Sequence, residues 1–192
     1  MQAVVARQVL SPVLLPGAAG RTDDFVRART SAVAALAALL DDAGLGAGET
    51  ASAPGLPPVL VVAPARWSRV AVDALPDLAS LGLDAPRPLG TGHADERSPR
   101  LDVTATVTVT LLRLAGWLGH VETVEVAEPR GDVVAADLDT VVAAALDGRR
   151  LVLLALGSDE LELPAGARPA LAAGHARVRA LADQMALAAV AP

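Results

Sequence analysis

Histidines beside carboxylates are the side chains of this chain best suited to metal or proton-transfer chemistry. His93 stands two residues before Asp95, and His120 stands two residues before Glu122. Imidazole and carboxylate can together hold iron or zinc, and either group can act as a general acid or base. Each histidine, however, lies in or beside an expected loop or helix end, where a solvated histidine is ordinary. We therefore expect no metal and no assigned catalytic residue, and keep these four residues as alternative ligands.

Arginines and one polar turn offer a second kind of chemistry, the binding of anions. Arg66 and Arg69 follow the apolar run Val59–Val62, and a guanidinium at a strand end can clamp a carboxylate or a phosphate. The turn Ser158-Asp159-Glu160 could supply an acid or a nucleophile, although no histidine stands nearby in the sequence. A hydrolase or dioxygenase with a rebuilt site, in which a histidine acts with Arg66, is the alternative function left open.

Absent residue types exclude several mechanisms. The chain has no cysteine, which excludes disulfides, iron–sulfur clusters and thiol nucleophiles. It has no lysine, which excludes Schiff-base catalysis and a P-loop. No Gly-x-Ser-x-Gly elbow supports serine catalysis. The glycines at 44, 46 and 48 resemble a phosphate loop, but they follow an expected helix instead of a strand. We expect no cofactor.

Composition favours one globular domain over residues 1–192. Hydrophobic residues make up 53% of the 192 residues and the net charge is −6, so disorder is excluded and nucleic-acid binding is not expected. Lys, Asn, Ile and Tyr are absent, which indicates a GC-rich bacterial genome. No apolar run reaches the roughly 18–20 residues of a membrane span. The first twenty residues lack the basic start of a signal peptide, so we expect a cytoplasmic protein. High apolar content with few aromatic residues favours a homo-oligomer.

Apolar periodicity predicts alternating strands and helices. Strands are expected near 3–10, 59–62, 121–127 and 151–156, and helices near 23–42, 132–146 and 168–189. Residues 103–110 alternate strictly between valine or alanine and threonine, which indicates a strand, but the length of 101–118 suits a helix better. The alternation of elements predicts an α/β fold with a central, mostly parallel sheet and helices on both faces.

Ligands of parallel sheets bind at the carboxyl ends of the strands. The segments that follow the strands are therefore expected to line a ligand-binding cleft, and we expect its ligand to be a small anion. The residues expected to line it are Ser11, Pro12, Ala65, Arg66, Trp67, Ser158, Asp159 and Glu160.

Four stretches resemble one known family. Val4 to Gly20, with Ser11-Pro12-Val13-Leu14-Leu15-Pro16, resembles that family's first strand and its His-Pro-Pro-Leu-Leu-Val-Pro turn. Val59 to Pro64 resembles a strand that runs into Ser-Pro-His. Asp23 to Asp42 resembles the family's first helix. The later helix, strand, helix and strand are matched by Leu101 to Trp117 and by Val124 to Ser158. On these motifs the chain resembles the class III extradiol dioxygenases, whose superfamily includes protocatechuate 4,5-dioxygenase β subunits and Memo proteins.

The resemblance implies a helix over 101–118 and a lost iron site. Active members hold Fe(II) with two histidines and a glutamate, and use another histidine as acid and base. Ser11 matches the first ligand position, Ala65 matches the second, and no histidine follows Gly157-Ser158. We expect the late glutamate to have no counterpart in a chain that ends at Pro192. The resemblance therefore implies a metal-free pseudoenzyme that binds a small ligand or another protein.

Overall fold

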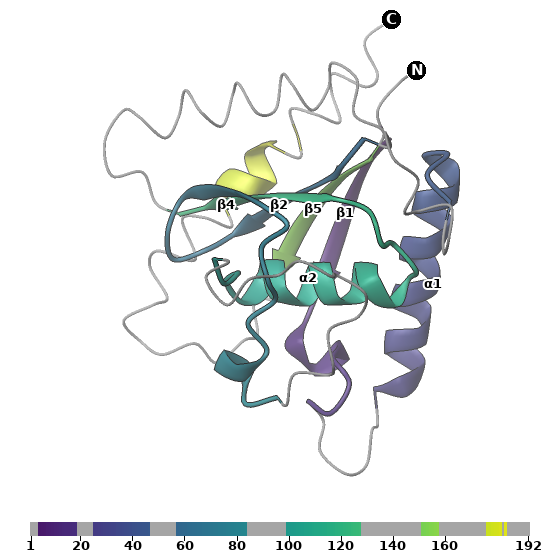
Figure 1. The fold of residues 1–192 in the computed structure, drawn as a ribbon, viewed down its shortest axis with the longest axis horizontal. Helices are drawn as coiled ribbons and strands as arrows, with labels where there is room; N and C mark the ends of the chain where they lie inside the picture. The colour runs from purple at the N-terminus through teal and green to yellow at the C-terminus, as the bar shows by residue number, and fades with distance from the viewer. Residues whose placement is uncertain are drawn as a thin grey trace, which may run out of the picture.

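A five-stranded sheet forms the centre of the molecule. The computed structural model describes residues 4–18, 25–46, 57–83, 99–127, 151–157, 176–181 and 183. The sheet has the order β1-β5-β2-β4-β3, seen in Figure 1. Strands β1, β5, β2 and β4 run parallel, and β3 pairs antiparallel with β4. The strands are β1 (Val4–Leu10), β2 (Val59–Pro64), β3 (Arg69–Val72), β4 (Val121–Val126) and β5 (Leu151–Gly157).

The inner strands are apolar on both faces, as expected for parallel strands covered on both sides. Every residue of β2 is buried, and so are residues 151–156 of β5. Val61 and Leu153 face one core, whereas Leu60 and Val152 face the other. The mostly parallel sheet predicted from these apolar runs is therefore confirmed.

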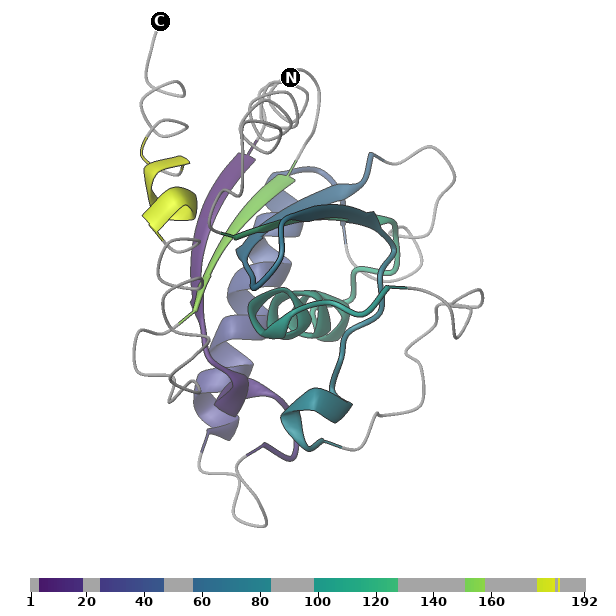
Figure 2. The same ribbon diagram turned by 90° about the vertical axis from the view of Figure 1, so that its left-hand side faces the viewer.

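Helices pack on both faces of the sheet, as predicted (Figure 2). Helices α1 (Val26–Asp42) and α2 (Val103–Leu114) lie on one face, where Leu36, Leu40 and the fully buried Trp117 belong to the larger core. On the other face, residues 176–181 and 183 are helical. Val178 and Leu181 from that segment pack with Val124 and Leu154 in a second core.

Helix α2 resolves the ambiguity of the alternating segment in favour of a helix. Residues 104–112 are all buried, so the segment is apolar enough to sit inside the fold. Its threonine hydroxyls donate to carbonyls of the helix itself: Thr108 bonds Thr104 at 2.8 Å and Thr110 bonds Thr106 at 2.7 Å. These bonds satisfy hydroxyls that would otherwise be buried without a partner. Asp102 caps the first turn by accepting from the backbone of Val103.

Three features differ from the sequence-based expectation or lie outside the described residues. Strand β3 was not expected, because it has only four residues and one buried position. Helix α1 begins at Val26 after the N-cap Phe25, and residues 23–24, with which the helix was expected to begin, are not described. The helix expected over 132–146 also lies outside the described residues. None of the helices that the structure describes is long and apolar enough to cross a membrane.

Candidate functional site

The carboxyl ends of the parallel strands meet at one edge of the sheet, here called the carboxyl edge. Ser11 follows β1 there and begins a short 3-10 helix, Pro12–Leu14, and both Ser11 and Pro12 are half-buried. Ala65 follows β2, is buried, and donates its backbone N–H to the carbonyl of Val126 at 2.9 Å. Because β5 lies between β1 and β2, Ser11 and Ala65 are separated by two strand spacings, about 10 Å.

Arg66 is held in place at the carboxyl edge by Asp102. One carboxylate oxygen of Asp102, Oδ2, accepts from the backbone N–H of Arg66 at 2.7 Å and from its Nε at 3.1 Å. The other oxygen, Oδ1, accepts from the backbone of Val103 at 2.8 Å. Asp102 is 7% exposed, whereas the Arg66 side chain is 55% exposed. The carboxylate therefore orients a guanidinium whose outer nitrogens make no hydrogen bond to the described residues.

A second arginine–carboxylate pair lies directly behind the first. Glu125 is a charged residue in an otherwise apolar stretch of β4, and its side chain is 1% exposed. Its Oε2 accepts from Nε of Arg69, and its Oε1 accepts from the backbone N–H of Asp102. Arg69 also donates through Nη2 to the carbonyl of Arg100. These bonds join β3, β4 and the start of α2 into one network, named here the Arg66–Glu125 network.

The buried carboxylates of this network are fully engaged. Each of the four oxygens of Asp102 and Glu125 accepts at least one hydrogen bond. Charge-assisted bonds of this kind hold a carboxylate in a fixed orientation. The carboxylates of Asp102 and Glu125 therefore position Arg66 and Arg69. The group that a ligand would meet at this edge is the Arg66 guanidinium.

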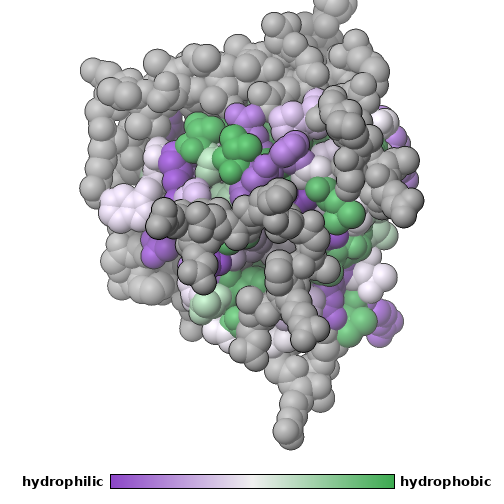
Figure 3. Space-filling model, viewed as in Figure 1, coloured by the Kyte–Doolittle hydropathy of each residue, from purple (hydrophilic) through white to green (hydrophobic). Residues whose placement is uncertain are grey.

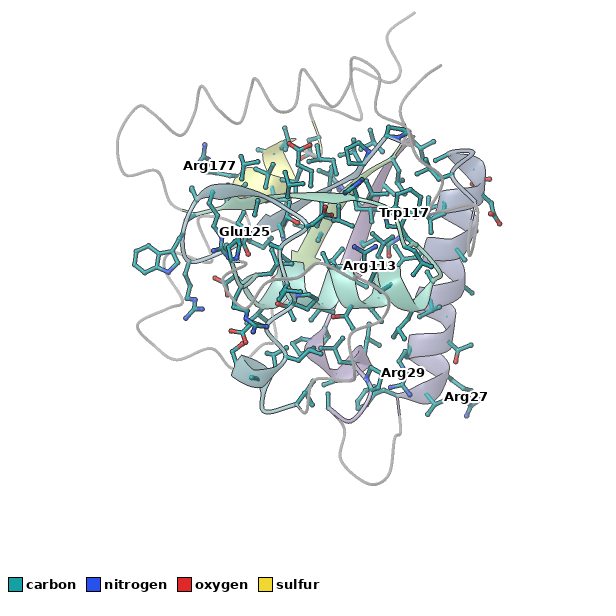
Figure 4. All side chains as sticks on the ribbon, in the orientation of Figure 1. Arg27, Arg29, Arg113, Trp117, Glu125 and Arg177 are labelled. Atoms are coloured by element: carbon teal, nitrogen blue, oxygen red, sulfur yellow. The ribbon has the colours of Figure 1, made fainter. Side chains whose placement is uncertain are left out.

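Further positive charge stands around the same edge. Arg177 donates through Nη1 to the carbonyl of Ala127 at 3.1 Å, and Ala127 directly follows β4. Ser68 accepts from the backbone N–H of Ala127 at 2.9 Å. Figure 4 shows Arg177 and Glu125 at this side of the molecule. Among the described residues of this edge, Arg66, Arg69, Arg100 and Arg177 outnumber the carboxylates Asp102 and Glu125.

His120 lies at the other end of β4, away from Arg66. It precedes β4, whereas Arg66 follows β2, and β2 and β4 run parallel in register from Val59–Val121 to Pro64–Val126. The structure thus separates His120 from Arg66 by about the length of a six-residue strand, roughly 20 Å. Glu122 is half-buried within β4.

His120 instead pairs with Asp73. Its Nδ1 is 2.6 Å from Oδ2 of Asp73, and Oδ1 of Asp73 accepts from the backbone of Val121 at 3.0 Å. Asp73 adopts a left-handed φ of 49°, which is uncommon outside glycine and asparagine-like residues. Both side chains are largely exposed. The pair fixes the turn into β4.

Arg113 supports the same turn from α2. Its Nη1 donates to the carbonyls of Trp117 at 2.9 Å and Gly119 at 2.7 Å. Burial lowers the pKa of Arg113, and the nearby carboxylate of Asp73 opposes that shift. Figure 4 shows Arg113 close to Trp117. The Arg113 guanidinium thus donates to carbonyl oxygens just beyond the helix, as is common for a cation in the last turn of a helix.

The remaining predicted residues are only partly tested. His93, Asp95, Ser158, Asp159 and Glu160 lie outside the described residues. Within the described part of the chain, no three His, Asp or Glu side chains are grouped so that they could hold a metal ion. Trp67 is described and is 64% exposed beside Arg66.

Comparison with known proteins adds no relative. A scan against protein-family models matches no family. Searches of the curated proteins and of the solved structures find no matching protein either. The function is therefore argued from the site itself.

Proposed function

We propose that the chain binds a small anionic ligand, a carboxylate or a phosphate, at the carboxyl edge of its sheet. The observation that carries this proposal is the Arg66 guanidinium, which is held by Asp102 through Nε and the backbone while its side chain remains 55% exposed. A guanidinium fixed in this way presents parallel N–H donors to a planar anion and loses little side-chain freedom on binding.

We also propose that the chain is a pseudoenzyme related to the class III extradiol dioxygenases. Ser11 and Ala65 stand at the positions that the resemblance assigns to two iron ligands. The Ala65 methyl group is buried and cannot coordinate a metal, and a serine hydroxyl is a poor ligand for Fe(II). Loss of the metal would leave the carboxyl edge as a place where a ligand binds without being oxidised. A cytoplasmic location and a homo-oligomeric or protein-bound state form part of the same proposal.

Trp67 supports an anion with a flat apolar part. Trp67 is 64% exposed and directly follows Arg66 in the chain, and an exposed indole near the site offers a stacking surface to a flat ligand. Aromatic carboxylates such as benzoate combine the two features. We expect benzoate to bind more tightly than inorganic phosphate.

Arg66→Gln is expected to weaken binding of benzoate by about tenfold or more, because it removes a charged hydrogen-bond donor worth roughly 1.5–3 kcal/mol. Isothermal titration calorimetry of the purified full chain with benzoate and with phosphate, at low salt, measures this directly. Arg27→Gln is the matched control, since Arg27 is exposed on α1 and lies across the molecule from Glu125 (Figure 4).

Two results would contradict the proposal. One is that wild-type protein binds neither probe at millimolar concentration. The other is that Arg66→Gln and Arg27→Gln change affinity equally, which would indicate a general charge effect in place of a site.

A further inference from the structure

Strand β3 leaves one side of its backbone unpaired among the described strands. It lies last in the sheet order and pairs only with β4. The backbone N–H of Asp73 donates to the carbonyl of Val121, and hydrogen-bonded residues alternate along an antiparallel pair. Asp73, Ala71 and Arg69 therefore direct their backbone groups to β4. Val70 and Val72 direct theirs outward.

The two residues with outward backbone groups also carry exposed apolar side chains. Val70 is 48% exposed and Val72 is 61% exposed. Both lie on the same face of the sheet, beside Val124 and Glu122 of β4 in the strand register. Figure 3 shows apolar side chains exposed among polar ones on the face seen in Figure 1. An open strand edge with apolar side chains is a template for pairing with another strand.

The charge pattern of this edge identifies its occupant. The segment Arg69-Val70-Ala71-Val72-Asp73 begins with a cation, ends with an anion and has an alanine at its centre. When two such segments run antiparallel about a two-fold axis through Ala71, Arg69 of each copy stands opposite Asp73 of the other. Val70 of each copy then stands opposite Val72 of the other. Within one chain Arg69 pairs with Glu125 and Asp73 pairs with His120. Both charged side chains remain partly exposed in these pairs, so each can also face a charge of the second copy.

We propose that β3 pairs with β3 of a second copy of this chain and joins two sheets into one across a two-fold axis. Val70 and Val72 of opposite copies form hydrogen-bonded pairs, and each pair exchanges two backbone hydrogen bonds. Their side chains meet on one face, where cross-strand β-branched pairs are stabilising. This is the self-complementary contact that two-fold dimers require. The inference assigns an interface to the homo-oligomeric state included in the proposed function, and it does not depend on the anion site.

The first test is the oligomeric state of a charged variant. Wild-type protein is expected to form a dimer of the 19.4 kDa chain in sedimentation velocity as concentration rises. Val70→Lys with Val72→Lys places lysines opposite each other, and we expect the dimer dissociation constant to rise by about tenfold or more. Val26→Lys is the matched control, because Val26 is a valine of similar exposure on α1. Circular dichroism confirms that each variant folds.

The second test fixes the register by cross-linking. The chain has no cysteine of its own, so any disulfide reports on introduced residues. Facing residues of a hydrogen-bonded pair have Cα atoms about 5.5 Å apart, which lies within the range of a disulfide. Val70→Cys with Val72→Cys is therefore expected to give a covalent dimer on oxidation. Val70→Cys alone is expected to give little, because equal residues lie diagonally across the axis.

Three outcomes would overturn the inference. The first is a monomer at every accessible concentration, which would leave β3 uncovered or reserved for a different protein. The second is a dimer that Val70→Lys with Val72→Lys weakens no more than Val26→Lys does, which would place the interface elsewhere. The third is equal cross-linking of the double and single cysteine variants, which would exclude the register set by the charges.

Discussion

Replacing Arg69 by leucine is expected to lower the free energy of unfolding by about 3–5 kcal/mol, because it leaves a buried carboxylate without its counter-charge. The Glu125 side chain is 1% exposed in the folded chain, so its carboxylate depends on donors from the protein. After the substitution Glu125 keeps one described donor, the backbone N–H of Asp102. Urea denaturation followed by circular dichroism gives the free energy of unfolding for each variant.

The control for this prediction is Arg66→Leu. Asp102 retains the backbone donors of Arg66 and Val103 after that change, and the Arg66 side chain is 55% exposed. We expect a loss of about 1 kcal/mol or less, as for pairs with an exposed partner. Replacing Arg69 and Glu125 together by leucine is expected to recover much of the lost stability, since apolar groups can replace a buried ion pair. A loss below about 1 kcal/mol for Arg69→Leu would show that Glu125 is not held as described.

Asp102→Ala is expected to lower the free energy of unfolding by about 2–4 kcal/mol. The loss of a helix N-cap costs about 1 kcal/mol, and the backbone N–H of Arg66 loses its partner at a further cost of about 1–3 kcal/mol. The same substitution also releases the Arg66 guanidinium from its fixed orientation, so binding of benzoate is expected to weaken in parallel.

Asp102→Asn separates the two roles of that residue. Asparagine caps helices about as well as aspartate, but it carries no charge to hold Arg66. Thermal and urea denaturation of this variant are expected to show less than half of the loss seen with alanine, while benzoate binding weakens. If Asp102→Ala and Asp102→Asn destabilise the chain equally, the cap contributes nothing, and the structural role assigned to Asp102 is wrong.

The sequence predicted the parts of the fold that depend on local apolar patterns. The apolar runs of β2 and β5 predicted buried parallel strands, and the recurrence of Leu36 and Leu40 predicted helix α1. The strict alternation over residues 103–110 was misleading by itself. It arises because threonine can be buried in a helix by bonding to the preceding turn.

The candidate site was predicted in part. Parallel strands place their carboxyl ends together, which identified Arg66 and Trp67 from chain order alone. Asp102 and Glu125 were missed, because their partners stand 23 to 56 residues away in the sequence, and no local pattern reveals such pairing. One signal was available: Glu125 stands between Val124 and Val126 in a strand expected to be buried, where a charge requires a partner.

Strand β3 and the Asp73–His120 pair were also missed. Four residues with one buried position give too little periodicity to indicate a strand. The structure places His120 at the amino end of β4, because it directly precedes that strand. Arg66 follows β2 and therefore lies at the opposite end of the sheet. The separation of the two residues is a direct consequence of the parallel register of β2 and β4.

The central claim is that Asp102 orients Arg66 for an anion, and the most direct test is the affinity of Arg66→Lys for benzoate. Lysine keeps the positive charge but lacks the Nε donor and the planar guanidinium. It therefore cannot bond Asp102 and at the same time offer two parallel N–H donors to the anion. Calorimetry is expected to show a loss of affinity of about tenfold or more, with Arg27→Lys binding as wild type does. Wild-type affinity in Arg66→Lys would contradict the account, because charge alone would then suffice.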